Sequence, residues 1–209
     1  MHRFALSVIL TLGLLIGGCS RQPVAVLRSL LGLQVGNRFE YIGEGNEYAS
    51  FTAQVSHSKG NRYQILEVTG GTILARIIEL RADGAYEILT QEEHYSGESL
   101  LNSPAITQRD RANDRKILPW PLQPGTRWRL PYGAEATLVT AEATHTVPAG
   151  TFGHVVHVRV VSTPQDPTDA VPATDYFYAP GVGLLERRFS QGEFTVTSRL
   201  GRRTGPDGQ

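Results

Sequence analysis

Hydrophobic and polar residues alternate along most of the chain after residue 33, which is the pattern of half-buried β-strands. In residues 49–58, for example, Phe51, Ala53 and Val55 fall on one face and polar residues fall on the other. Turns that contain glycine recur between these segments, and no long stretch of helical period interrupts them. The pattern predicts an all-β domain, an antiparallel meander that forms a curved sheet or an open barrel.

The chain also resembles itself. Residues 33–41 (LQVGNRFEY) and 122–130 (LQPGTRWRL) share an apolar start, a glycine turn and a strand with an aromatic residue, 89 positions apart. Phe39 and Trp128 share a register, and the same offset places Tyr63 opposite Phe152. We therefore predict two related halves, at about 33–95 and 122–200, and the alternative is chance likeness between β-rich segments.

The segments around these halves have a different composition. Residues 108–116 (QRDRANDRK) carry mixed charge without an apolar face, which predicts a solvated connection between the halves, with a binding loop as the alternative. Residues 202–209 are polar and contain glycine and proline, so we expect a flexible tail after a β-domain at 33–201.

The N-terminal residues predict export. Residues 1–18 combine a basic start, an apolar run from Phe4 to Ile16 and two glycines, as in a signal peptide. The apolar run is shorter than the roughly 20 residues that a membrane-spanning helix needs. Cys19, the only cysteine, follows at once, and Ile16-Gly17-Gly18-Cys19 resembles the lipobox of bacterial lipoproteins.

That resemblance implies acylation of Cys19, with palmitate among the acyl chains, and a lipid anchor in the membrane. Ser20 stands where an aspartate would resemble an inner-membrane retention signal, so we expect the outer membrane if the cell has one. The alternatives are a transmembrane anchor or an ordinary signal peptide followed by a stray cysteine. Residues 19–32 would then be the lipidated cysteine and a tether. Because Val24, Leu27 and Leu30 have helical spacing, we expect this tether to pack against the domain rather than lie on the lipid.

Two phrases in the second half resemble a family of exported bacterial lipoproteins of unknown function. They are the P-x-G-T-F turn at 148–152, followed by a valine-rich strand, and the segment Y-F-Y-A-P-G-V-G at 176–183, which resembles the family's Y-x-A-P-G-V-G turn. The resemblance implies an antiparallel β-domain similar to that of lipoprotein carriers, and it implies no activity.

Charge and motifs narrow the function classes. Twenty basic and twenty acidic residues give no net charge, so we expect no nucleic-acid partner. The sequence lacks the motifs of the common hydrolases, zinc enzymes and nucleotide-binding proteins, and we expect no cofactor and no catalytic residues. His57, His145 and His154 are weak candidates for a metal site, since His57 and His145 each come shortly before a hairpin turn. We find no acidic residue placed to orient them.

Aromatic residues are the remaining candidates for a site. Trp128, Tyr176 and Tyr178 could form an apolar surface on the concave side of the sheet, whereas Arg187 and Arg188 suggest a solvated strand face. The sequence thus favours a non-catalytic envelope lipoprotein that binds or scaffolds an amphiphile or an envelope protein. The alternative is an envelope hydrolase or metal-dependent enzyme that uses the histidines.

Overall fold

The structure is a computed structural model that describes residues 23–164, 166 and 168–208. The expected signal peptide and Cys19 lie outside these residues. Twelve antiparallel strands form one open sheet, which confirms the predicted all-β fold class. The strands are β1 (Arg38–Glu44), β2 (Phe51–Lys59), β3 (Arg62–Val68), β4 (Ile73–Arg81), β5 (Gly84–Gln91), β6 (Arg115–Pro119), β7 (Arg127–Arg129), β8 (Glu135–Val147), β9 (Gly150–Val161), β10 (Ala173–Ala179), β11 (Gly183–Gln191) and β12 (Phe194–Thr204). The helices are α1 (Pro23–Leu30), α2 (Pro104–Thr107) and the short 3-10 turns Arg111–Asn113 and Pro131–Gly133.

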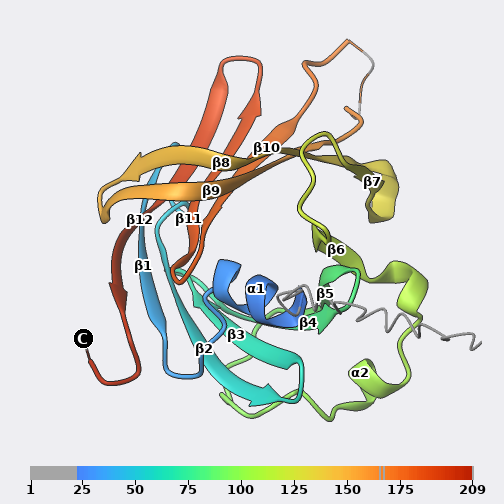
Figure 1. The fold of residues 1–209 in the computed structure, drawn as a ribbon, viewed down its shortest axis with the longest axis vertical. Coiled ribbons are helices and arrows are strands. Elements are labelled where there is room, and N and C mark those ends of the chain that lie inside the picture. Colours follow the sequence, from blue (N-terminus) through green and yellow to red (C-terminus); the bar gives the residue numbers. More distant parts are fainter. Residues whose placement is uncertain (1–22, 165, 167, 209) are drawn as a thin grey trace, which may run out of the picture.

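The sheet consists of two six-stranded meanders joined side by side. Its strand order is β6-β5-β4-β3-β2-β1-β12-β11-β10-β9-β8-β7, so both meanders run in the same direction and meet where β1 pairs with β12. The sheet curves strongly, and β6 and β7, its two edge strands, lie on the same side of the molecule (Figure 1). The meanders span 38–119 and 127–204, so the first half includes the β6 strand that we had not predicted.

The two meanders begin with the same hydrogen bonds. Gly36 N donates to Val55 O, and Val55 N donates to Asn37 O. In the second half, Gly125 N donates to Leu138 O, and Leu138 N donates to Thr126 O. Both glycines have a positive φ, 95° and 87°, which explains why each turn uses glycine. Phe39 pairs with Ala53 and Trp128 pairs with Ala136, so these aromatic residues hold equivalent positions.

The equivalence of Tyr63 and Phe152 is wrong. Val55 and Leu138 are equivalent residues of the two meanders. Val55 pairs with Ile65 and Leu138 pairs with Val158, so Ile65 is equivalent to Val158, and Tyr63 is equivalent to Val156. A bulge follows both Val55 and Leu138, so the ladders agree up to that point. Beyond the bulge, the β8–β9 hairpin is longer than the β2–β3 hairpin. A sequence alignment that matches the two hairpin turns therefore pairs residues that are not structurally equivalent.

Helix α1 lies on the concave side of the sheet, where it contacts β4, β5, β10 and β11 (Figure 1). Leu27 and Leu30 are buried in the main core, so residues 23–30 belong to the domain and are not an extended tether. The end of the helix sits on the β10–β11 turn, because Gly181 N donates to both the carbonyl and the hydroxyl of Ser29, at 3.1 and 2.8 Å. The A-P-G-V-G turn is therefore the part of the sheet to which the end of this helix is hydrogen-bonded.

Residues 92–114 cover the outer face of β3–β5, and the expectation of a solvated connection is wrong in part. Leu101 and Ile106 form a second apolar cluster with Ile77 and Ile88. Within the charged run, Arg109 bonds to Asp114 and to Glu79 of β4, and the side chains of Arg109 and Asp114 are almost buried. Paired charges thus fix the charged run to the sheet, although this run has no apolar face of its own.

The last strand, β12, pairs with β1. Strand β12 continues to Thr204, beyond the expected boundary at Gly201, because Arg202 pairs with Glu40 and Arg203 with Phe39. The Arg202 guanidinium also bonds to the Glu40 carboxylate at 2.6 Å. The expected tail therefore begins later than residue 202.

Candidate functional site

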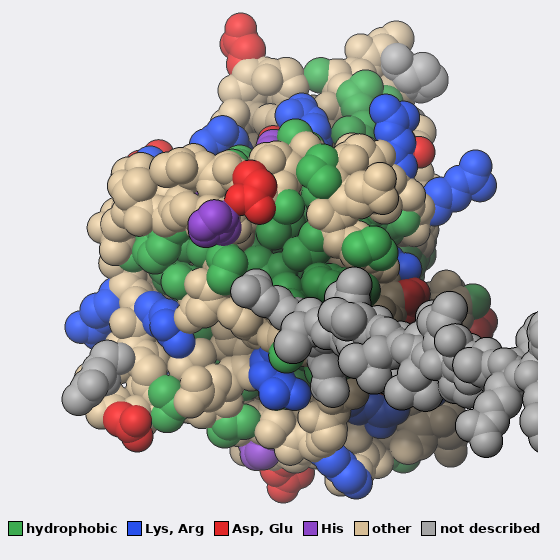
Figure 2. Space-filling model, in the orientation of Figure 1, with side chains coloured by type: hydrophobic (Ala, Val, Ile, Leu, Met, Phe, Trp, Pro, Cys, Tyr) green, Lys and Arg blue, Asp and Glu red, His purple; other side chains and the backbone are tan. Residues whose placement is uncertain are grey.

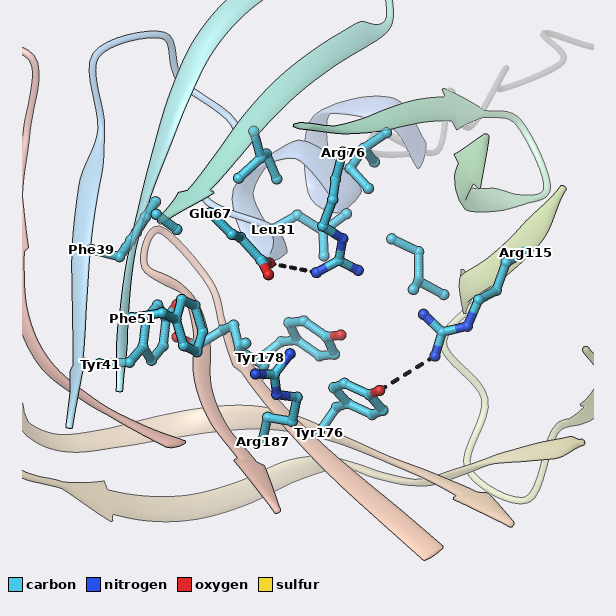
Figure 3. Close-up of a pocket in the computed structure, with 15 residues that line it drawn as sticks. Leu31, Phe39, Tyr41, Phe51, Glu67, Arg76, Arg115, Tyr176, Tyr178 and Arg187 are labelled. Carbon is cyan, nitrogen blue, oxygen red and sulfur yellow. Dashed lines mark hydrogen bonds and ion pairs between the residues drawn. The ribbon is translucent and has the colours of Figure 1, made fainter. Parts of the chain in front are cut away.

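A cavity of about 90 Å³ lies inside the curved sheet, between the two meanders. Its apolar walls come from the helix end, from β1–β4 and β6, and from β11, and they consist of Leu31, Phe39, Phe51, Ala53, Ile65, Ile78, Ile117 and Leu184. The polar side chains that reach it are Tyr41, Glu67, Arg76, Arg115, Tyr176, Tyr178 and Arg187 (Figure 3). The site is therefore amphipathic: aromatic and aliphatic walls enclose a small set of charges and hydroxyls.

Hydrophobic side chains also gather at the centre of the face seen in Figure 2, in the hollow between the strands. Charged side chains lie mostly around this hollow. The concave side thus presents apolar surface to the exterior as well as to the cavity.

Arg76 bridges two carboxylates of neighbouring strands on this concave side. Its guanidinium bonds to Glu67 at 2.5 Å and to Glu87. Burial raises the pKa of Glu87, but the charges of Arg76 and Arg115 outweigh it and hold that pKa below its ordinary value. Burial would lower the pKa of Arg76, yet the two carboxylates raise it well above normal. Arg76 and its two carboxylates are thus paired with one another.

The buried tyrosines are protonated hydrogen-bond donors. Burial raises the pKa of both Tyr41 and Tyr178 well above the ordinary value for tyrosine. The Tyr41 hydroxyl donates to Leu184 O at 2.9 Å, which fixes its ring against the stacked ring of Phe51 at a centroid distance of 4.4 Å. The Tyr178 hydroxyl has no hydrogen-bond partner within the described part of the chain.

Two further arginines reach the cavity from opposite meanders. Arg115 of β6 donates to the Tyr176 hydroxyl at 3.3 Å and lies 3.8 Å from Glu87. It therefore links the edge of the first meander to the second. Arg187 of β11 lies with its guanidinium 5.0 Å from the centre of the Phe51 ring, a cation–π contact.

Arg187 faces inward because of a β-bulge, and the expectation of a solvated strand face is wrong for it. Phe177 pairs with Glu186 and Tyr178 with Leu184, so Leu185 is an extra residue in β11. The bulge reverses the alternation, and both Leu184 and Arg187 point to the cavity. Arg188 remains outside the cavity, where it pairs with Glu186 at 2.5 Å.

The three aromatic candidates do not lie in one place. Tyr176 and Tyr178 line the cavity, with their rings stacked at 6.3 Å. Trp128 does not line it: the residue sits in edge strand β7, and its indole nitrogen donates to Lys116 O of the other edge strand at 2.8 Å. Trp128 thus joins the two edges of the sheet.

The three candidate histidines are in separate places. His57 forms a hydrogen bond with its neighbour Ser56, with Nδ1 3.1 Å from Oγ. His145 bonds to the buried Glu186 at 2.9 Å, and His154 bonds to the exposed Glu142 at 2.6 Å. Within residues 23–208 as described, no group of three or more histidine, cysteine, aspartate or glutamate side chains is arranged to hold a metal ion.

The expectation that no acidic residue orients the histidines is wrong. Besides the Glu186 and Glu142 contacts, His157 bonds to Asp175 at 2.7 Å. The imidazoles of His145 and His157 stack on either side of the Phe177 ring, at 4.1 and 4.4 Å. His157 and Asp175 are diagonal neighbours on the paired strands β9 and β10, whereas His145 of β8 reaches Glu186 of β11. Sequence spacing alone does not show these contacts. None of these histidines lines the cavity.

The anchor prediction concerns residues outside the described part. Residues 1–18 and Cys19 are not among the described residues, so the predicted acylation stays a prediction. In the described residues, no helix has both the length and the apolar character to cross a membrane.

Comparison with known proteins gives two similar folds. No protein-family model matches the chain, and no curated protein matches it. One similar solved structure is described as an exported protein with a YmcC-like fold, from Bacteroides fragilis, and another as a lipoprotein from Parabacteroides distasonis. Each is 12% identical, has a TM-score of 0.46 and matches 84% of this chain, and the matches span 99% and 98% of those chains. The likeness concerns the fold alone, and nothing about function follows from it.

Proposed function

We propose that the protein is a lipoprotein of the cell envelope that is anchored through acylated Cys19 and binds a small amphiphile in its cavity without chemical conversion. We place it in the outer membrane if the cell has one. The observation that carries the proposal is the amphipathic cavity on the concave side of the sheet, between two meanders and beside α1.

The position of the cavity relative to the predicted anchor supports the same function. Helix α1 begins at Pro23, four residues after Cys19, and residue Leu31 just after the helix lines the cavity. Four extended residues span at most about 14 Å. An acylated Cys19 would therefore hold α1 and the cavity close to the bilayer, where amphiphiles are concentrated.

The state of the acidic groups supports binding rather than acid–base chemistry. A general acid in such a site needs a pKa that is raised towards neutrality. The pKa of Glu87 is lowered instead, and Glu67 is hydrogen-bonded to Arg76. Both carboxylates serve to place a guanidinium.

The anchor is tested by replacement of Cys19 with Ala, followed by cell fractionation and mass measurement of the mature protein. We expect loss of the acyl mass and release from the membrane. Membrane retention with no change of mass would contradict the anchor.

The binding function is tested by native mass spectrometry of the full chain, purified from membranes in a mild detergent. We expect one bound small amphiphile per chain. Ala53→Met, which fills the cavity, should abolish the adduct, whereas Ala141→Met in β8, a half-buried site outside the cavity, should keep it. A bound transition metal that is lost in His145→Ala would favour the metal-enzyme alternative, and a bound envelope protein with an empty cavity would favour scaffolding.

A further inference from the structure

We propose that the ligand is a carboxylate with an apolar body, and that Arg187 binds its carboxylate inside the cavity. This inference rests on the proposed function and names the class of amphiphile.

The first argument is that Arg187 lacks an acidic partner. Arg76 bonds to Glu67 and Glu87, and Arg115 lies near Glu87. Arg187 forms no ion pair within 4.0 Å of any described carboxylate, and its guanidinium lies over the Phe51 ring. Arg187 is half-buried, and partial withdrawal of a guanidinium from water without a counter-ion has a cost. An anionic ligand would remove that cost.

The second argument is the charge of the site as a whole. Three guanidinium groups reach the cavity, those of Arg76, Arg115 and Arg187. Two carboxylates oppose them, those of Glu67 and Glu87. The surplus is one positive charge, which a ligand with a single negative charge would neutralise.

The third argument is the geometry of the donors. A guanidinium presents paired N–H groups that match the two oxygens of a carboxylate. Arg187, Tyr176 and Tyr178 point into the same cavity in Figure 3. The Tyr178 hydroxyl stays protonated and has no partner within the described part of the chain, so it can donate a further hydrogen bond to a carboxylate oxygen.

The walls define the rest of the ligand. Phe39, Phe51, Ile65 and Leu184 are apolar and accept methylene or aromatic groups. The cavity of about 90 Å³ is smaller than the apolar cavity of roughly 150 Å³ that accepts benzene in another protein. It therefore holds the carboxylate and a few carbons, and the remainder of a medium chain would lie along the hydrophobic hollow in Figure 2.

The test uses the full chain in nanodiscs of zwitterionic phospholipid, with empty nanodiscs as the blank. Octanoate, octanol and octylamine are titrated calorimetrically at pH 7. We expect octanoate to bind with a 1:1 stoichiometry at least tenfold more tightly than octanol, and octylamine not to bind.

Variants then separate the arginines. Arg187→Gln should weaken octanoate binding at least tenfold and leave octanol binding unchanged, and Arg187→Lys should restore part of the affinity. Arg188→Gln is the matched control, because the neighbouring side chain lies outside the cavity and Glu186 keeps its bond to His145. Its octanoate affinity should stay within twofold of the parent.

The outcomes distinguish the two proposals. Equal binding of octanoate and octanol, with no effect of Arg187→Gln, would overturn the carboxylate inference and leave amphiphile binding standing. Absence of any binding above the blank would overturn both. The comparison of ligands on the parent protein decides the inference even if Arg187→Gln fails to fold.

Discussion

Gln64 and Glu98 are joined by a hydrogen bond that fixes the outer segment to the sheet: the Gln64 amide nitrogen lies 2.9 Å from Glu98 O. The other end of the same amide accepts from Leu100 N at 2.7 Å. Gln64 is fully buried, and its loss leaves Leu100 N without its hydrogen-bond partner, while Glu98 O keeps a contact with His94 Nε2 at 3.0 Å. We expect Gln64→Leu to lower the free energy of unfolding by about 1–3 kcal/mol in urea titrations. Replacement of the exposed Gln91 by Leu should change it by less than about 0.5 kcal/mol, and equal effects would contradict this role.

Arg76 stabilises the concave side through two acidic partners, Glu67 and Glu87. Arg76→Met should cost about 3–5 kcal/mol, because it leaves two partly buried carboxylates without a counter-ion. The matched control adds Glu67→Gln and Glu87→Gln to the same chain, which removes both charges and should restore much of the loss. Chemical denaturation of the three proteins measures the difference. If the triple variant is no more stable than Arg76→Met, the pairing does not explain the cost.

Gly32 and Gly60 have almost the same φ, 61° and 59°, but very different surroundings. A Cβ on Gly32 would lie 2.4 Å from Val182 O, whereas a Cβ on Gly60 would meet nothing within 4 Å. Gly32→Ala should therefore lower the thermal midpoint much more than Gly60→Ala, since both carry the strain of positive φ and only the first displaces the end of α1 from the β10–β11 turn. Equal shifts of the midpoint in a thermal melt would show that the contact between the end of α1 and the β10–β11 turn does not stabilise the protein.

Stability should fall in acid. The pKa of Glu79 is lowered by its hydrogen bonds from Arg81 and Arg62, which outweigh burial. The pKa of Asp175 is likewise lowered by His157 and Arg159, again against burial. A carboxyl with a lowered folded pKa binds protons more readily when unfolded, so its stabilisation is complete above the ordinary pKa of about 4 and is lost as the pH falls towards the folded value.

Urea midpoints measured from pH 7 to pH 3 should therefore decline mainly below about pH 4.5. Glu79→Gln should be less stable than the parent at pH 7 and should show a shallower decline. A parent midpoint that is constant down to pH 3 would be the contrary result.

The sequence predicted the fold better than the site, for a physical reason. Alternation and glycine turns are local, and the equivalence of Phe39 and Trp128 followed from them. The inward direction of Arg187 depends on the Leu185 bulge, which only the pairing of β10 with β11 reveals. The expectation that Arg187 and Arg188 both belong to a solvated strand face therefore misplaced Arg187.

The histidine contacts were missed for a related reason. His145 of β8 meets Glu186 of β11, and His157 of β9 meets Asp175 of the neighbouring strand β10. These contacts depend on strand pairing and on the curvature of the sheet, which no local pattern indicates. Tyr176 and Tyr178, which the sequence offered for an apolar surface, share a face because they are two positions apart on one strand, and both line the cavity.

The central claim, that the cavity inside the sheet holds an amphiphile, is tested most directly by the place where a ligand attaches. A diazirine analogue of octanoate is irradiated with the full chain in nanodiscs, and the modified peptides are identified by mass spectrometry. The account predicts that the label falls on cavity segments of β1, β10 and β11, and that an excess of octanoate suppresses it. Labelling that is confined to exposed residues such as Tyr132 and Val171, or that octanoate does not suppress, would contradict it.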